Sequence, residues 1–94
     1  MSSLLQKQIG ALAFSVLPKD SKIGFFGSRV KGTPSKFSDV DLVILGKTKI
    51  PGHMLELVRE KMEKSSLPYK VDVVDLNSVS KDFQKNVINE VVWL

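Results

Sequence analysis

Two aspartates, Asp39 and Asp41, open the most apolar segment of this 94-residue chain, DVDLVILG. If that segment is a strand, both side chains project from one face, about 7 Å apart along the backbone. Carboxylates at that spacing can bind one hard cation such as Mg²⁺, or bridge two. The alternative is that both are solvated or paired with lysines, and a D-x-D pair alone does not decide between these readings.

Gly27 and Ser28 end a short aromatic run, KIGFF, and lead into a cluster of cations. A glycine at the end of a strand lets the backbone approach a ligand, and a serine in the next turn offers a hydroxyl and N–H groups to an anion. The pair therefore suits a phosphate, although Ser28 would equally serve as a turn cap. Gly27 and Gly32 imitate P-loop spacing, but Thr33 and Pro34 follow where that motif needs lysine and then serine or threonine.

A third candidate carboxylate lies in the later apolar run VDVVDL, residues 71–76. Strand alternation would put Asp72 and Asp75 on opposite faces, so only one of them can share a face with the first pair. We favour Asp72, because a carboxylate beside a metal site can take the proton from an attacking hydroxyl. Asp75, at the end of the run, is expected to be a cap or a supporting residue.

Apolar spacing outlines the elements that must position these residues. A helix is expected over about residues 3–17, started by a Ser3 and Gln6 capping box and ended before Pro18. Further along the chain we expect strands at residues 22–26, 39–46 and 69–76, a helix from Pro51 and a last helix after Ser80. The final VVWL is compatible with helix or strand.

The expected fold class is α+β, with a small mixed sheet of three strands, or four if the last residues pair, packed with helices in one domain over residues 1–94. The connection around residues 28–38 is short for a crossover, even with a turn of helix after Gly27, so we expect a mixed sheet and not a fully parallel one.

Length and composition restrict the classes of function. The chain is 43% apolar and 26% charged, and no segment approaches the ~18 apolar residues of a membrane span. It has no cysteine, which excludes thiolate metal sites and supports a cytoplasmic location without deciding it. The net charge of +4, concentrated between Lys19 and Lys49, suits a phosphate-bearing ligand or simply a solvated basic surface.

Taken together, Gly27-Ser28, ten further residues, Asp39-Val40-Asp41 and a later strand with Asp72 resemble the nucleotidyltransferases of the DNA polymerase beta superfamily. More narrowly, FGSRVKG, SDVDLVIL and VDVVDL on so short a chain resemble the minimal nucleotidyltransferases, which occur beside HEPN-domain partners in toxin–antitoxin pairs. The resemblance covers nearly the whole chain and implies a polymerase beta-like nucleotidyltransferase fold.

The resemblance also implies roles for the motif residues. Asp39, Asp41 and Asp72 would be the catalytic carboxylates and would bind two Mg²⁺ ions that carry the triphosphate of ATP. Nucleotide binding is implied for a second set of residues: Gly27, Ser28, Arg29 and Lys31. The implied reaction is transfer of AMP from ATP to a hydroxyl of a protein acceptor. Many relatives have arginine where Lys31 stands, so this position would act as a point charge, and Arg29 is the remaining candidate for a bidentate contact.

Three functions stay open from the sequence. The first is an adenylyltransferase that modifies a HEPN-domain partner and so acts as its antitoxin. The second is a catalytically idle subunit that neutralises its partner by docking. The third, a nucleic-acid-binding domain, is disfavoured because an exposed pattern of stacking aromatics is lacking.

A partner is expected on physical grounds as well. So small a domain has little surface left to cover its sheet, and Val92, Trp93 and Leu94 would leave apolar area exposed. A complex with a HEPN-domain protein, or a homodimer, would bury it. Val43 and Leu45 are expected to fill the chain's own core.

Overall fold

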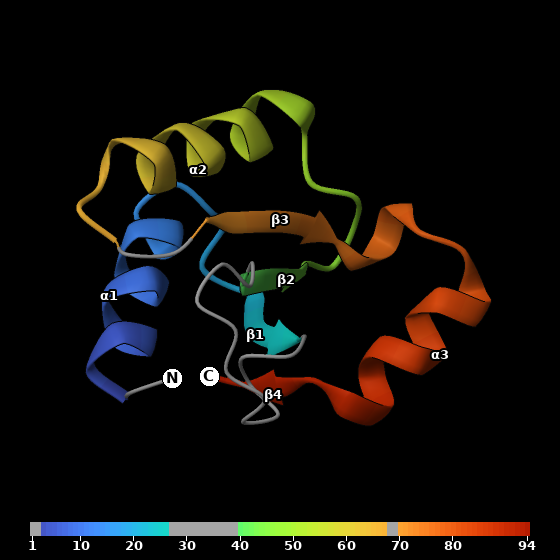
Figure 1. Cartoon of the computed structure of the whole chain (residues 1–94). Coiled ribbons are helices and arrows are strands. Elements are labelled where there is room, and N and C mark those ends of the chain that lie inside the picture. Colours follow the sequence, from blue (N-terminus) through green and yellow to red (C-terminus); the bar gives the residue numbers. More distant parts are fainter. Residues whose placement is uncertain (1–2, 27–39, 68–69) are drawn as a thin grey trace.

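The computed structural model describes residues 3–26, 40–67 and 70–94 (Figure 1). The described elements, in chain order, are α1 (Ser3–Phe14), β1 (Lys22–Phe26), β2 (Val40–Leu45), α2 (Gly52–Lys64), β3 (Val71–Asp75), the 3-10 turn η1 (Leu76–Ser78), α3 (Lys81–Glu90) and β4 (Val92–Trp93). The helices and strands that the sequence predicts are therefore present in the structure, in the predicted order. The turn of helix considered after Gly27 lies outside the described residues.

The strands form one mixed sheet in the order β3-β2-β1-β4. β2 pairs in parallel with β3 and antiparallel with β1, and β4 pairs antiparallel with the other edge of β1. This confirms the predicted α+β class and the mixed sheet. The four-stranded alternative is the one observed, because the VVWL segment supplies β4 as a strand.

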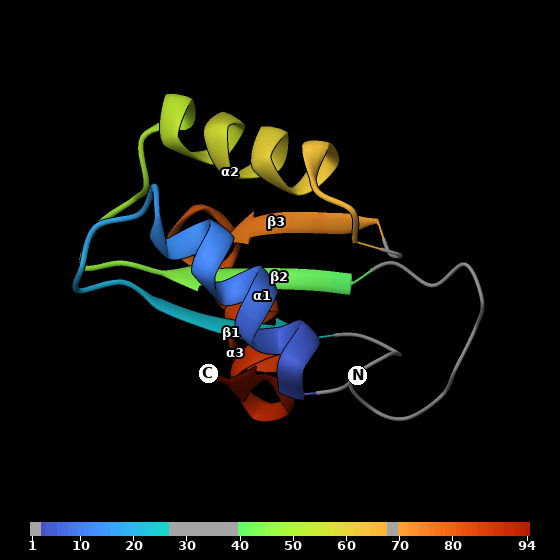
Figure 2. The same ribbon diagram turned by 90° about the vertical axis from the view of Figure 1, so that its left-hand side faces the viewer.

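One face of the sheet carries the main core. Ile23 pairs with Ile44, and Phe25 pairs with Leu42, so these side chains share that face, and all four are buried. They pack with buried residues of the two long helices, among them Ile9 and Ala13 of α1 and Val58 and Met62 of α2. Figure 2 shows α1 in front of the sheet and α3 behind it, so α3 covers the opposite face.

On the opposite face, the described residues form a smaller core cluster. Val43 of β2 packs there with Leu76 and with Val87 of α3, and Phe26, Leu45, Val79 and Val91 surround this second cluster. The prediction that Val43 and Leu45 belong to the core is confirmed for Val43, which is 1% exposed, while Leu45 is half-buried. Because Asp41 lies two residues before Val43, it shares this face near the start of β2.

α1 is shorter than expected. The α-helix ends at Phe14, and the following residues form irregular turns, in which the Val16 and Leu17 N–H groups share the Ala13 carbonyl as acceptor, each at 3.1 Å. Pro18 disfavours helical geometry at the residue before it, so the last turn before Pro18 loses regular α-helical form. Leu17 still reaches the core and is 6% exposed.

Gly24 lets β4 approach β1 closely. A β-carbon at this position would lie 2.5 Å from Val91 Cγ2 and 2.8 Å from Trp93 Cε3. We expect Gly24→Ala to lower the free energy of unfolding by about 1–3 kcal/mol, because β4 or its side chains must shift. Urea unfolding measures this. The matched control is Gly52→Ala, since nothing lies within 4 Å of an added β-carbon there, and equal stability of the two variants would contradict the prediction.

Candidate functional site

Three residues form a row on the sheet face that carries the second cluster. Phe26 of β1 is the register partner of Asp41 in β2, and Asp41 is the register partner of Asp72 in β3. Neighbouring strands lie about 5 Å apart and register partners point to the same face, so the two carboxylates are neighbours. The predicted choice of Asp72 over Asp75 as the aspartate on the face of Asp41 therefore agrees with the register.

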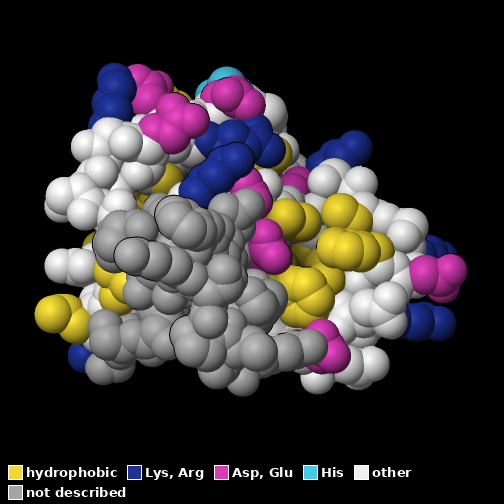
Figure 3. All heavy atoms as spheres, viewed as in Figure 1, with side chains coloured by type: hydrophobic (Ala, Val, Ile, Leu, Met, Phe, Trp, Pro, Cys, Tyr) yellow, Lys and Arg dark blue, Asp and Glu magenta, His cyan; other side chains and the backbone are white. Residues whose placement is uncertain are grey.

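The two aspartates sit at the boundary between core and solvent. Both are half-buried, while Val40 and Leu42, on either side of Asp41, are 0% exposed. Figure 3 shows acidic side chains near the middle of this face, between an apolar patch on the α3 side and Lys or Arg side chains on the α2 side. Adjacent like charges on one sheet face repel, and a bound cation relieves that repulsion.

Carboxylate oxygens are the ligands that Mg²⁺ prefers, so Asp41 and Asp72 fit a magnesium site in ligand type and in arrangement. Asp39, the third predicted ligand, lies outside the described residues. Within residues 3–26, 40–67 and 70–94, no group of three or more acidic, histidine or cysteine side chains gathers as a metal site. The pair is thus the described part of the predicted triad.

The predicted phosphate-binding residues also fall outside the described part of the chain: Gly27, Ser28, Arg29 and Lys31. The sequence links these residues to the row of Phe26, Asp41 and Asp72, because Gly27 directly follows Phe26, the last residue of β1. The predicted cradle therefore begins in the sequence directly after the β1 register partner of Asp41.

Asp75 has a structural position, as expected for a cap. It is 3% exposed, and its carboxylate accepts hydrogen bonds from the N–H of Ile50 at 2.8 Å and from that of Asn77 at 3.0 Å. The second bond caps η1, while the first fixes the chain just before α2. Asp75 therefore holds the connection between β2 and α2 against the end of β3.

Removing that carboxylate should be costly. We expect Asp75→Ala to lower the free energy of unfolding by about 2–4 kcal/mol, because two N–H groups lose their buried acceptor. Chemical denaturation measures this. Asp20→Ala is the control, since Asp20 makes an exposed ion pair with Lys47 at 3.4 Å, and such pairs contribute about 0–1 kcal/mol. A loss no larger for Asp75→Ala than for the control would refute this role.

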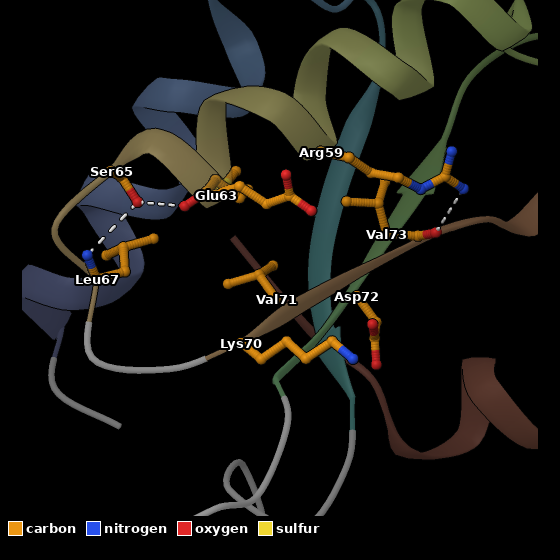
Figure 4. A pocket seen from close by; sticks show the side chains of 9 residues that line it. Arg59, Glu63, Ser65, Leu67, Lys70, Val71, Asp72 and Val73 are labelled. Atoms are coloured by element: carbon orange, nitrogen blue, oxygen red, sulfur yellow. Dashed lines mark hydrogen bonds between the residues drawn. The ribbon is translucent and has the colours of Figure 1, made fainter.

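Sequence reasoning did not identify a pocket that borders Asp72 (Figure 4). It has a volume of about 300 Å³ and lies between the C-terminal half of α2 and β3, with Arg59, Glu63 and Lys70 among its lining residues. The Arg59 guanidinium bonds to Glu56 at 2.5 Å and donates to the Val73 carbonyl at 3.5 Å. No sequence motif signals this pocket, because it depends on α2 lying along the edge strand.

Comparison with known proteins decides the family. Residues 15–94 match the family model described as polymerase beta, nucleotidyltransferase. The chain belongs to this family of nucleotidyltransferases. The predicted family and the polymerase beta-like fold are thereby confirmed.

Two relatives are named as protein adenylyltransferases. The chain is 36% identical over 69 residues to a probable protein adenylyltransferase MntA of Haemophilus influenzae, covering 73% of this chain and 60% of the relative. It is 33% identical over 73 residues to the protein adenylyltransferase MntA of Thermococcus cleftensis, covering 78% of this chain and 73% of the relative. The chain thus spans less than two thirds of the first relative's length.

Solved structures extend the likeness to three dimensions. A crystal structure of a toxin–antitoxin with AMP-PNP has a TM-score of 0.80 and 28% identity, covering 94% of this chain and 70% of the other. A tri-AMPylated HEPN toxin of Shewanella oneidensis in complex with its MNT antitoxin matches with a TM-score of 0.75 and 27% identity, covering 99% of this chain and 71% of the other.

In the described part of this chain, no helix is long and apolar enough to cross a membrane.

Proposed function

We propose that this chain transfers AMP from ATP to a hydroxyl group of a HEPN-domain partner and thereby acts as an antitoxin. The carrying observation is the placement of Asp41 and Asp72 as register partners on one face of a nucleotidyltransferase fold. The two relatives named as protein adenylyltransferases support the reaction, and the complex with a tri-AMPylated HEPN toxin supports the partner.

Each proposed site residue has a distinct task. Asp39, Asp41 and Asp72 would hold two Mg²⁺ ions, which would offset negative charge on the triphosphate and the departing pyrophosphate. The phosphates would be held by a second set of residues, Gly27, Ser28, Arg29 and Lys31. The register of β2 and β3 supports the roles of Asp41 and Asp72. The roles of the other residues rest on the spacing of the family's motif.

The chemical step is a substitution at the α-phosphorus of ATP. The acceptor's hydroxyl oxygen forms a bond to that phosphorus, and the bond to the pyrophosphate oxygen breaks as pyrophosphate leaves with the electron pair. Asp72 takes the hydroxyl proton, because its carboxylate is half-buried at the outermost position of the row and still reaches solvent. The products are an AMP-modified partner and pyrophosphate.

The exposed apolar C-terminus supports a protein partner. Val92, Trp93 and Leu94 are 46%, 37% and 51% exposed, as the sequence predicted, and they lie at the β4 edge of the sheet. Large apolar side chains gathered at a sheet edge favour association with another protein. A HEPN-domain protein is the partner that we propose for this surface.

Labelled ATP tests the proposed transfer. The unmodified HEPN toxin of Shewanella oneidensis is incubated with this chain, Mg²⁺ and ATP labelled in either the α- or the γ-phosphate. Covalent incorporation of the α-label alone is expected, because AMP is transferred and pyrophosphate leaves. A stable complex without α-label would instead support the idle docking subunit. Incorporation of the γ-label would mean phosphorylation and would overturn the proposal, and so would absence of both complex and label.

A further inference from the structure

Lys70 lies directly before β3 and belongs to the same ladder as Asp72. The Val40 N–H donates to the Lys70 carbonyl at 2.9 Å, so the parallel pairing of β2 with β3 extends to this residue. Because alternate residues of a strand point to one face, Lys70 shares a face with Asp72 and therefore with Asp41, the register partner of Asp72. Lys70 is thus a cation on the face that carries the proposed catalytic carboxylates.

The Lys70 side chain is directed toward Asp72. Figure 4 shows it running along the strand, with its ammonium group pointing toward the Asp72 carboxylate, while Val71 and Val73 point to the other side of β3, toward α2. Same-face neighbours in a strand lie about 7 Å apart at the backbone, and a lysine carries its charge on a flexible four-carbon stem. The ammonium can therefore reach a group bound at Asp72 while the backbone stays in place.

The charge of Lys70 is available for a ligand. Lys70 is exposed, and it makes no ion pair with another residue in the ranges 3–26, 40–67 and 70–94. Arg59 on α2 differs in this respect, because its guanidinium is already paired with Glu56. The pocket of about 300 Å³ borders both Lys70 and Asp72, so there is open space beside the ammonium group. An anionic group can therefore enter there without displacing a described ion pair.

A site loaded with nucleotide needs further positive charge. The carboxylates of Asp39, Asp41 and Asp72, together with a triphosphate, carry more negative charge than two Mg²⁺ ions offset. During transfer, negative charge is spread over the oxygens of the phosphorus under attack. A cation that is fixed beside those oxygens stabilises the transition state. Lys70 is suited to this task, because it shares both the strand and the face of Asp72.

We propose that Lys70 is a further phosphate-binding residue, whose ammonium group contacts the α-phosphate of the nucleotide bound at Asp41 and Asp72. The proposal rests on the proposed function and adds a residue that lies outside the Gly27-Ser28 and Asp39-Val40-Asp41 motifs. The α-phosphate is the group that is transferred, so it must lie at the carboxylates during the reaction. A lysine contacts phosphate as a point charge, which lets it follow the phosphorus as the bonds change.

Nucleotide binding tests the assignment without turnover. In the presence of Mg²⁺, Lys70→Gln should weaken binding of AMP-PNP about tenfold or more, because one charge-assisted contact is lost. Binding of AMP should weaken by a similar factor, since both ligands have an α-phosphate, and Lys70→Arg should restore most of the affinity. Lys22→Gln is the matched control and should bind like wild type. Lys22 points to the same sheet face, but it lies at the far end of β1, four residues before Phe26.

Two binding results would overturn the proposal. Unchanged or tighter binding of AMP-PNP by Lys70→Gln would mean that the lysine only offsets the charge of Asp72. A loss confined to AMP-PNP, with AMP bound as by wild type, would place the lysine at the β- or γ-phosphate and not at the α-phosphate.

Kinetics separate a contact with the nucleotide from a contact with the partner protein. With the HEPN toxin of Shewanella oneidensis as acceptor, Lys70→Gln should lower kcat for AMP transfer on the order of 10²-fold, because charge develops at the phosphate that it contacts. KM for the toxin should stay within about twofold of wild type. A raised KM for the toxin with unchanged nucleotide affinity would overturn the proposal. A wild type that binds AMP-PNP through Lys70 but transfers no AMP would count against the proposed function alone.

Discussion

Asp41→Asn is expected to reduce AMP transfer by on the order of 10³-fold while leaving the fold intact. The side chain is half-buried in the middle strand and is the register partner of Asp72, so its charge lies at the centre of the proposed site. Asparagine keeps the size of the side chain and much of its hydrogen-bonding capacity, but it is a far weaker ligand for Mg²⁺. Initial rates with α-labelled ATP measure the loss.

The same variant should bind nucleotide more weakly when Mg²⁺ is present. Wild type should bind AMP-PNP more tightly with Mg²⁺ than without it, and Asp41→Asn should lose most of that difference. Asp20→Asn is the control, because Asp20 is an exposed aspartate outside the site. Thermal unfolding should be unchanged in both variants. Full activity of Asp41→Asn would rule out a metal-binding role for this residue.

Asp72→Asn is expected to lower the rate of transfer about 10²–10⁴-fold, the range for loss of a general base. Asp72 is half-buried on the edge strand, beside Asp41 on the same sheet face. If its main task is to take the hydroxyl proton, affinity for AMP-PNP with Mg²⁺ should fall much less than in Asp41→Asn. Steady-state kinetics and equilibrium binding on the same preparations separate the two effects.

The dependence on pH gives a readout that a purely structural role would not produce. An acceptor hydroxyl of the tyrosine type ionises with a pKa near 10, so at alkaline pH such an acceptor needs less help in losing its proton. The deficit of Asp72→Asn relative to wild type should therefore shrink as pH rises from about 7 toward 10. A deficit that stays constant over this range would argue against proton transfer to Asp72.

The period of two in the strands made part of the site predictable. Asp72 and Asp75 differ by three positions, so alternation alone separated the aspartate beside Asp41 from the one that caps η1. The apolar run from Leu42 to Leu45 likewise predicts a central, covered strand, and β2 lies between β3 and β1 with Leu42 to Ile44 buried and Leu45 half-buried. These inferences needed only local geometry, which is why they agree with the structure.

Features that depend on distant contacts were not predictable in the same way. VVWL could not be assigned as strand or helix, because its pairing depends on Gly24, where the absence of a side chain leaves room for Trp93. The sequence does not indicate the pocket beside Asp72, because Arg59 and Glu63 have no feature that distinguishes them from other polar residues on the exposed side of a helix. Neither feature is encoded in short-range spacing, since each arises from how elements far apart in sequence pack together.

Intact-protein mass spectrometry of a HEPN-domain partner tests the central claim most directly. The unmodified HEPN toxin of Shewanella oneidensis, incubated with this chain, ATP and Mg²⁺, should gain the mass of one or more AMP groups, and it should gain none with Asp41→Asn in place of the wild type. An unchanged toxin mass, together with a toxin that the chain nevertheless inhibits, would contradict the account and identify the chain as a subunit that acts by docking.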